Sequence, residues 1–77
     1  MHAIETVHAV QQINKLTERQ RQVLGLVLGG HQNKNIAVLL GVSQRTVENH
    51  RQMIYQRTGT RSLAELVRLG LLAGIDA

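Results

Sequence analysis

The turn Gly41-Val42-Ser43 constrains the fold of this chain most strongly, because it separates two helical patterns by only a few residues. The segment before it, NKNIAVLL, places apolar residues on one side of a short helix. Gly41 can end that helix in a left-handed conformation, which glycine adopts without steric cost. Ser43 can cap the next helix by accepting a hydrogen bond from its first turn. Two helices joined so tightly indicate a helix-turn-helix, with an unrelated helical hairpin as the alternative.

Capping patterns predict two further helices, one on each side of this pair. Thr17 and Gln20 form a capping-box pattern, in which each side chain satisfies a backbone N–H of the other residue. Ser62 and Glu65 repeat this pattern near the end of the chain. We therefore predict an all-α fold, a four-helix bundle that contains a helix-turn-helix. The expected helices are opened by Thr17, by Asn33 as a cap, by Ser43 and by Ser62, and they end near residues 28, 40, 57 and 73.

The expected core is aliphatic, because the chain has no Phe or Trp while 43% of its residues are hydrophobic. A chain of 77 residues forms one domain and buries about 60% of its unfolded surface. The residues expected on the inward helix faces are Val23, Leu24, Val27, Leu28, Ile36, Ala37, Leu39, Leu40, Val47 and Ile54.

Residues 1–15 do not fit the four-helix pattern. Apolar residues recur there at every third position, and each such step shifts the side chain by about 60° around a helix. The apolar side chains therefore do not form one stripe. We expect a linker or a partly helical extension that packs weakly, followed by the helix-turn-helix domain over residues 16–77.

Composition excludes several classes of protein. The chain has no cysteine, so disulfides and thiolate metal sites are excluded and an intracellular setting is the default. No apolar run approaches the roughly 18 residues of a membrane span, and the first residues lack a secretory pattern. We expect a cytoplasmic protein with no membrane partner.

The basic residues are concentrated in one half of the chain. Residues 33–68 contain six basic and two acidic residues, a balance of +4, whereas the remainder contains three of each. The whole formal net charge of +4 therefore belongs to this segment. Such an excess favours a polyanionic partner, although charge alone fits an ordinary solvated surface equally well.

The helix after Ser43 has a polar outer face that suits double-stranded DNA. In a helix-turn-helix the second helix enters the major groove, where its outward side chains meet base edges. Arginine pairs with guanine, asparagine and glutamine pair with adenine, and glutamate accepts a hydrogen bond from cytosine. A single tyrosine disfavours single-strand or RNA binding, which uses several stacking rings. With Val47 and Ile54 turned inward, the outward residues are Gln44, Arg45, Glu48, Asn49 and Gln52.

A resemblance to a known family extends over the run LTERQRQVLGLVLGGHQNKNIAVLLGVSQRTVENHRQMIYQRTGTRSLAELVRLGL. This run resembles the LuxR/FixJ-type DNA-binding domain of bacterial transcription regulators. The family pattern is roughly LTxRExEVLxLVAxGxSNKEIAxxLxIS, then xRTVExHRxxIxxKLGxxSLxELVRLAL, and it matches about residues 16–72. The portions RTVE-x-HR and SL-x-ELVRL resemble the FixJ-like response-regulator branch most closely. The resemblance implies the output domain of a two-component regulator, in which the third helix contacts DNA and the fourth forms a homodimer. The chain is then either the end of a longer regulator or an autonomous small one, because it has no room for a receiver or ligand-binding domain.

Roles for individual residues follow by position in the family pattern. The base-contacting positions correspond to Arg45, Glu48, Asn49 and Gln52. The positions that contact the DNA backbone correspond to Lys34, Thr46, His50, Arg51, Arg61 and Ser62. The free N–H groups at the start of the third helix add a phosphate contact close to Ser43. Apolar positions cover more of the fourth helix than one core stripe requires, so we expect a dimer seam there, with packing against the N-terminal extension as the alternative. The seam residues are Leu63, Leu66, Val67, Leu69, Gly70 and Ala73.

Four departures from the family pattern change what we expect of capping and packing. Gln20 and Asn35 replace glutamates, so a buried polar contact between the first two predicted helices is expected to differ. Gln32 replaces a capping serine at the start of the second helix. Thr58 replaces a leucine, so the end of the third helix is expected to pack less well.

The role of Glu48 has two interpretations. It is either a surface charge that pairs with Arg45 or Gln52, or an acid that selects cytosine and repels phosphate elsewhere. His50 is interpreted as a partly buried histidine whose outer nitrogen donates to a phosphate.

No pattern indicates catalysis, and no enzyme activity or cofactor is expected. The sequence lacks a Ser/His/Asp or Cys/His arrangement, a phosphate-binding loop after a strand, and paired carboxylates on one face. We expect no metal site, because no two of the four histidines have a ligand spacing on one helix face. The expected partners are double-stranded DNA and a second copy of the chain, with RNA polymerase as a further candidate. The alternatives are a helical protein-interaction module that has lost DNA binding and a sigma-factor-like promoter-binding region.

Overall fold

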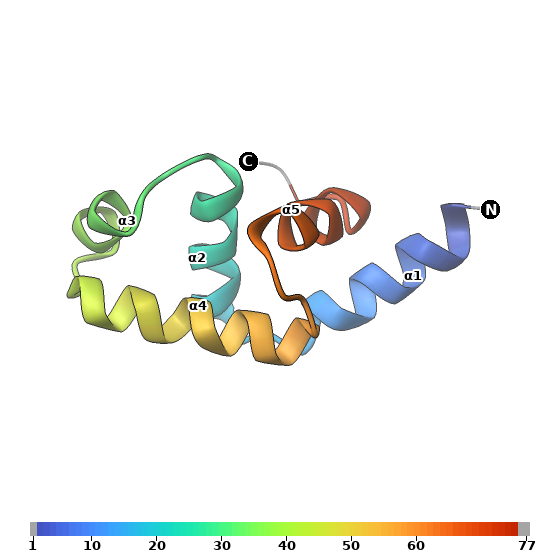
Figure 1. The fold of residues 1–77 in the computed structure, drawn as a ribbon, viewed down its shortest axis with the longest axis horizontal. Coiled ribbons are helices and arrows are strands. Elements are labelled where there is room, and N and C mark those ends of the chain that lie inside the picture. The colour runs from blue at the N-terminus through green and yellow to red at the C-terminus, as the bar shows by residue number, and fades with distance from the viewer. Residues whose placement is uncertain (1, 76–77) are drawn as a thin grey trace.

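The computed structural model describes residues 2–75, which form five α-helices joined by short connections (Figure 1). These are α1 (His2–Ile13), α2 (Glu18–Leu28), α3 (Asn33–Leu40), α4 (Gln44–Thr58) and α5 (Leu63–Leu72). No strand occurs in this range, which confirms the all-α prediction. The four predicted helices are α2–α5, and α1 is an additional helix. None of the described helices has the length and hydrophobicity needed to cross a membrane. The outer limits of the two predicted domain ranges, residues 1 and 77, lie outside the described residues.

Reciprocal capping determines where α2 begins. The hydroxyl of Thr17 accepts a hydrogen bond from the N–H of Gln20 at 3.2 Å, and the side-chain oxygen of Gln20 accepts one from the N–H of Thr17 at 3.0 Å. Two N–H groups that a helix start leaves without partners are thereby satisfied. The helix is closed by Gly29, and Gly30 follows with a φ of 86°. The capping-box prediction is confirmed.

The turn between α3 and α4 has the predicted glycine geometry. Gly41 closes α3 with φ 69° and ψ 34°, a left-handed conformation that costs other residues roughly 1–2 kcal/mol. The hydroxyl of Ser43 then accepts a hydrogen bond from the N–H of Thr46 at 3.1 Å and opens α4. The start of α3 differs from the prediction. Its cap is Gln32, whose side chain makes no capping hydrogen bond, whereas Asn33 is already helical.

The start of α5 carries half of the predicted capping box. The hydroxyl of Ser62 accepts a hydrogen bond from the N–H of Glu65 at 3.1 Å, as expected. The returning carboxylate accepts from the N–H of Arg61, one residue earlier than predicted, at 3.3 Å. This exchange still holds the loop before α5 against its first turn.

The core is formed by one side of each helix, where α4 meets α2 and α3 and where α5 meets α1 and α2. Leu39 is an exception to the predicted core, because 58% of its surface is exposed. The step of three residues from Ile36 carries Leu39 past the edge of the buried face of α3. Leu28 and Leu40 are half-buried against the core. The fully or almost fully buried apolar residues are Ala9, Ile13, Leu16, Val23, Leu24, Val27, Ile36, Ala37, Val47, Ile54, Leu66 and Leu69.

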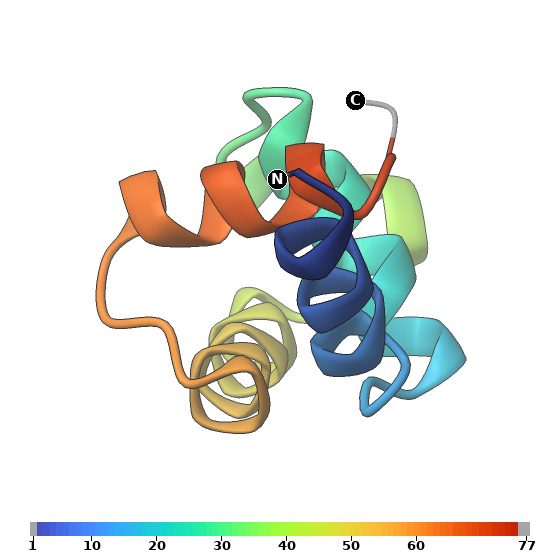
Figure 2. The ribbon, with the colours of Figure 1, turned by 90° about the vertical axis from the view of Figure 1, so that its right-hand side faces the viewer.

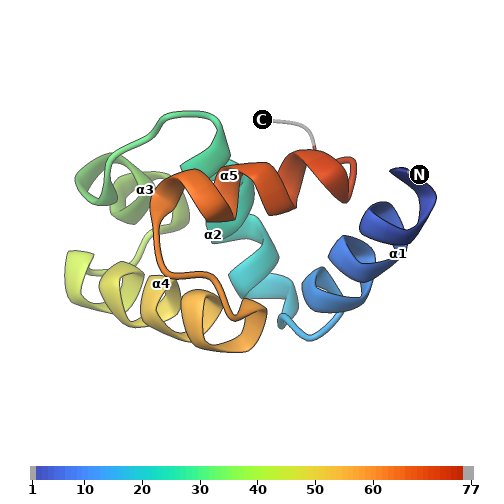
Figure 3. The ribbon, with the colours of Figure 1, turned by 45° about the vertical axis from the view of Figure 1, so that its right-hand side comes forward.

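The first helix packs against α5, as Figures 2 and 3 show from two directions. Ala9 and Ile13 are buried in the same core as Leu66, so α1 is not the weakly packed extension that we predicted. Ile4 and Val7 belong to the same three-residue series but are exposed, because the series drifts around the helix. Whether a separate domain begins at residue 16 stays a prediction.

Candidate nucleic-acid interface

The outer face of α4 is an uncovered polar surface. In Figure 1, α2, α3 and α5 lie on one side of α4, and no helix of residues 2–75 covers its opposite side. The outward residues predicted from sequence are all exposed, namely Gln44, Arg45, Glu48, Asn49 and Gln52. The structure therefore brings the four predicted base-contacting residues together on one accessible face.

The buried side of α4 determines which residues point outward. Val47 and Ile54 are both 0% exposed and pack in one cluster with Ile36 of α3 and Leu24 of α2. A rotation of α4 by one residue, about 100°, would place polar side chains in this aliphatic core. The orientation of the polar face is thus a consequence of core packing.

A polar contact anchors the C-terminal end of α4 to the start of α2. A guanidinium nitrogen of Arg57, Nη1, donates to Oε1 of Gln20 at 3.1 Å and to the carbonyl oxygen of Lys15 at 3.4 Å. Gln20 is only 5% exposed, so its amide group lies inside the domain. We predicted a changed contact between the first two predicted helices, α2 and α3, but the buried contact of Gln20 joins α2 to α4. The other departure, Asn35, is exposed.

Thr58, the last residue of α4, is buried and its hydroxyl is hydrogen-bonded. Thr58 is 7% exposed, and its hydroxyl donates to the carbonyl oxygen of Ile54 at 2.7 Å. The hydroxyls of Thr58 and Thr60 are also 2.9 Å apart and hydrogen-bonded. The polar atom is therefore satisfied within the protein. Thr58 also lines a hollow beside α5, so the expected looser packing stays a prediction.

Two hydroxyl groups lie at the start of α4. The Oγ of Ser43 and the Oγ1 of Thr46 are 3.0 Å apart, and either can be the donor. One hydroxyl hydrogen is consumed by this bond, so the other remains free to donate to an external acceptor. Ser43 is exposed and Thr46 half-buried, which makes their shared site accessible.

A polar hollow of about 470 Å³ separates the first turns of α3 and α4. Its lining includes two cationic residues, Lys34 and Arg51, and no acidic residue. The guanidinium of Arg51 donates from Nη1 to Oδ1 of Asn33 at 3.1 Å across the hollow. Asn33 was not among the predicted site residues. No local pattern could have identified it, because its partner lies 18 residues further along the chain.

The remaining predicted backbone contacts differ in accessibility. His50 is half-buried on α4, as expected. Arg61 and Ser62 are exposed in the connection between α4 and α5, whose course Figure 1 shows. The hydroxyl of Ser62 also donates to the carboxylate of Glu65 at 3.3 Å. A phosphate would have to compete with that acid for the same hydroxyl.

Comparisons with known proteins agree with this geometry. The model of the family described as "Bacterial regulatory proteins, luxR family" matches residues 14–70. The chain belongs to the luxR family of bacterial regulatory proteins. Its luxR-type fold therefore carries the DNA-binding helix-turn-helix of a transcription regulator.

Individual relatives of this luxR-family chain are regulators by name. It is 46% identical over 65 residues to the transcriptional regulatory protein FixJ of Azorhizobium caulinodans, which covers 84% of this chain and 31% of the relative. It is 45% identical over 62 residues to FixJ of Rhizobium meliloti, with coverages of 80% and 30%. The solved structure of the response regulator StyR matches 79% of this chain and 31% of its own, with 46% identity and a TM-score of 0.77. The luxR-family chain thus spans about a third of the length of these relatives.

The predicted dimer seam of this luxR-family domain needs correction. Leu66 is 0% exposed, so it cannot meet a second molecule, and Gly70 is also buried. Leu69 is 9% exposed and lines a hollow between α1 and α5. These residues face α1 and α2, which cover that side of α5. The side of α5 away from the core exposes Leu63 at 49% and Leu71 at 65%. Val67 and Ala73 are half-buried.

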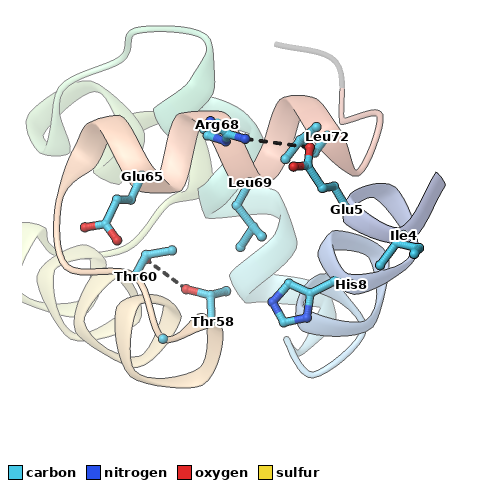
Figure 4. Close-up of a pocket in the computed structure, with 10 residues that line it drawn as sticks. Ile4, Glu5, His8, Thr58, Thr60, Glu65, Arg68, Leu69 and Leu72 are labelled. Carbon is cyan, nitrogen blue, oxygen red and sulfur yellow. Dashed lines mark hydrogen bonds and ion pairs between the residues drawn. The ribbon is translucent and has the colours of Figure 1, made fainter. Parts of the chain in front are cut away.

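A second hollow, of about 540 Å³, lies between α1, α5 and the connection that follows α4. Figure 4 shows Glu5 of α1 pointing toward Arg68 of α5, with His8, Thr58 and Thr60 nearby. The Glu5 and Arg68 side chains form an ion pair with an N–O distance of 3.7 Å and are 49% and 70% exposed, respectively. Exposed pairs of this kind contribute about 0–1 kcal/mol. This hollow contains none of the predicted base-contacting residues.

Proposed function

We propose that the domain binds duplex DNA sequence-specifically, with α4 in the major groove. The observation that carries the proposal is the uncovered polar face of α4 opposite the buried Val47 and Ile54. Its side chains have the hydrogen-bonding groups that discriminate base pairs in the major groove. The proposed base contacts are Arg45, Glu48, Asn49 and Gln52.

The DNA backbone is contacted by residues around this face. Lys34 and Arg51 bring two positive charges to the hollow between α3 and α4, and the free hydroxyl hydrogen at Ser43 and Thr46 suits a phosphate oxygen. Such contacts position the protein on the duplex without selecting a sequence. His50, Arg61 and Ser62 are the further proposed backbone contacts.

Glu48 contributes to sequence selection in this proposal. Its exposed carboxylate lies among hydrogen-bond donors and amides on the same face of α4. A carboxylate repels phosphate in every sequence and gains a hydrogen bond only where cytosine presents its amino group. It therefore lowers affinity for unrelated DNA more than for a cognate site.

At the level of the whole regulator, we propose a cytoplasmic response regulator whose output domain is this chain. The names of FixJ and StyR as regulatory proteins support this role, as does their threefold greater length. Dimerisation through the exposed side of α5 would place two recognition helices on paired half-sites. RNA polymerase is the proposed protein partner during transcription control.

Fluorescence anisotropy with labelled random duplex DNA tests the proposed function. We expect binding at low salt and a steep loss of affinity as the salt concentration rises, because the protein displaces counterions from the phosphates. Selection of bound sequences from a random duplex pool should then yield a half-site and a fixed spacing. Absence of any binding at low salt would favour a helical protein-interaction module instead.

A further inference from the structure

We propose that Asn33 is a positioning residue that holds Arg51 where it can contact a backbone phosphate. This inference rests on the proposed function, in which the hollow between α3 and α4 meets DNA. The side-chain oxygen of Asn33 accepts the hydrogen bond from Nη1 of Arg51 at 3.1 Å, and both residues line that hollow.

The position of Arg51 on α4 explains why it needs a partner. Arg51 follows Val47 by four residues and precedes Ile54 by three, so it borders the buried stripe of the helix. Its side chain is half-buried and leads toward the first turn of α3. A long arginine side chain has many rotamers, and fixing one costs up to about 2 kcal/mol of conformational entropy. The bond to Asn33 supplies this ordering before DNA arrives.

The bond also joins the two helices of the helix-turn-helix, from the first turn of α3 to the middle of α4. Asn33 is the first residue of α3, and Lys34 follows it on the same turn. With Arg51 held at Asn33, charges from both helices line the same hollow. A guanidinium has five N–H donors, and the bond to Asn33 uses one of them. The remaining donors can bind a phosphate oxygen while the bond to Asn33 persists.

Variants at Asn33 and Arg51 separate this role from simple stiffening of the fold. The probe is a labelled random-sequence duplex, and its Kd is measured over a series of salt concentrations beside the melting temperature of each protein. Asn33→Ala and Arg51→Ala should each raise Kd about tenfold, the loss expected for one charge-assisted hydrogen bond. Each should also lower the slope of log Kd against log salt by about 0.9, the value for one phosphate contact. The double variant should bind no more weakly than Arg51→Ala, because both changes remove the same contact.

Asn33→Asp separates the stability of the fold from the affinity for DNA. It keeps an acceptor for Arg51 and should match or exceed the wild-type melting temperature, yet it places a negative charge beside the phosphate. We expect it to bind DNA as weakly as Asn33→Ala. A merely structural role for the bond predicts instead that Asn33→Ala lowers the melting temperature and leaves the salt slope at the wild-type value. The matched control is Asn35→Ala, an exposed asparagine on the same helix, which should change neither Kd nor the slope.

The outcomes distinguish this inference from the proposed function. No wild-type binding to duplex DNA at low salt overturns both. Salt-dependent wild-type binding overturns the role of Asn33 alone if Asn33→Ala keeps the wild-type salt slope, or if the losses of the two alanine variants add in the double variant. Should Asn33→Ala fail to fold, the salt slope of Asn33→Ser, whose shorter side chain leaves Arg51 out of reach, provides the comparison.

Discussion

Arg57, near the end of α4, donates to the same side-chain oxygen of Gln20 that closes the capping box of α2. The family pattern has glutamate and lysine at these two positions, whereas this chain has an amide and a guanidinium. The side-chain oxygen of Gln20 therefore accepts hydrogen bonds from both the start of α2 and the end of α4. These hydrogen bonds anchor the C-terminal end of α4, whereas the tight turn of the helix-turn-helix precedes its N-terminal end.

Gln20→Ala should lower the free energy of unfolding by about 2 kcal/mol, because it removes a capping bond and leaves Arg57 without its buried acceptor. Urea denaturation followed by circular dichroism measures this change. Gln22→Ala, an exposed change on the same helix, should stay within about 0.5 kcal/mol of the wild type.

Gln20→Glu should stabilise the domain near neutral pH, because a carboxylate keeps the acceptor and adds an ion pair with Arg57. The pairing lowers the carboxyl pKa on folding, so the gain is present above the unfolded value of about 4.3 and is lost as the pH falls through the lower folded value. Urea denaturation of the wild type and of Gln20→Glu at pH 7 and at pH 3 measures the difference in their free energies of unfolding. Equal destabilisation by Glu and Ala at position 20 would contradict the role assigned to the oxygen.

Gln32→Ser should stabilise the protein by about 1 kcal/mol by supplying the missing cap of α3. The backbone of Gln32 already has φ −81° and ψ 159°, which suits a capping serine. Thermal denaturation measures the gain. Ser43→Ala is the reverse test, because it removes the existing serine cap of α4. It should lower the free energy of unfolding by about 1 kcal/mol. A destabilised Gln32→Ser variant would mean that the glutamine side chain has another role.

Leu28 and Gly70 should behave as a coupled pair. A Cβ added to Gly70 would lie 2.5 Å from a methyl carbon of Leu28, although the family pattern has alanine at both positions. Gly70→Ala should be about neutral in the wild type, because the cost of moving the tip of the Leu28 side chain offsets the helix-propensity gain of alanine. After Leu28→Ala, it should instead stabilise by about 1 kcal/mol through its helix propensity. A double-mutant cycle by chemical denaturation measures the coupling, and additive effects would rule it out.

Base and backbone contacts should respond differently to alanine substitution. Asn49→Ala should cost about 1–3 kcal/mol on the cognate site and relax sequence preference, with little change on random DNA. Lys34→Ala should weaken binding to all sequences alike and lower the salt slope by about one unit. Anisotropy titrations with selected and random duplexes compare the two. Equal effects on both duplexes for both variants would contradict the division between these residues.

Leu71→Lys should weaken self-association if the exposed side of α5 forms the dimer seam. Leu71 is 65% exposed on that side, so the substitution leaves the monomer fold intact while it places charges in the contact. Sedimentation equilibrium with and without DNA measures the change. Ile4→Lys, at an exposed apolar position of α1, is the control and should not alter association.

Local signals predicted most of the framework. The caps at Thr17, Ser43 and Ser62 and the left-handed Gly41 depend on neighbours within four residues, so sequence alone locates them. The outward face of α4 was also predictable, because Val47 and Ile54 leave one way for the helix to bury its apolar side. Predictions failed where local preference competed with distant partners. Asn33 could have capped α3, but its side-chain oxygen bonds to Arg51 instead.

The sequence by itself determined the capped starts of α2, α4 and α5, the tight turn and the family, because these depend on short-range hydrogen bonds and helical periodicity. Only the tertiary structure decided that α1 packs against α5 and that Leu66 belongs to the core rather than to a dimer seam. It also decided the contacts of Arg51 with Asn33 and of Arg57 with Gln20. Such contacts join residues 18 and 37 positions apart, and they exist only after the hydrophobic core has brought the helices together.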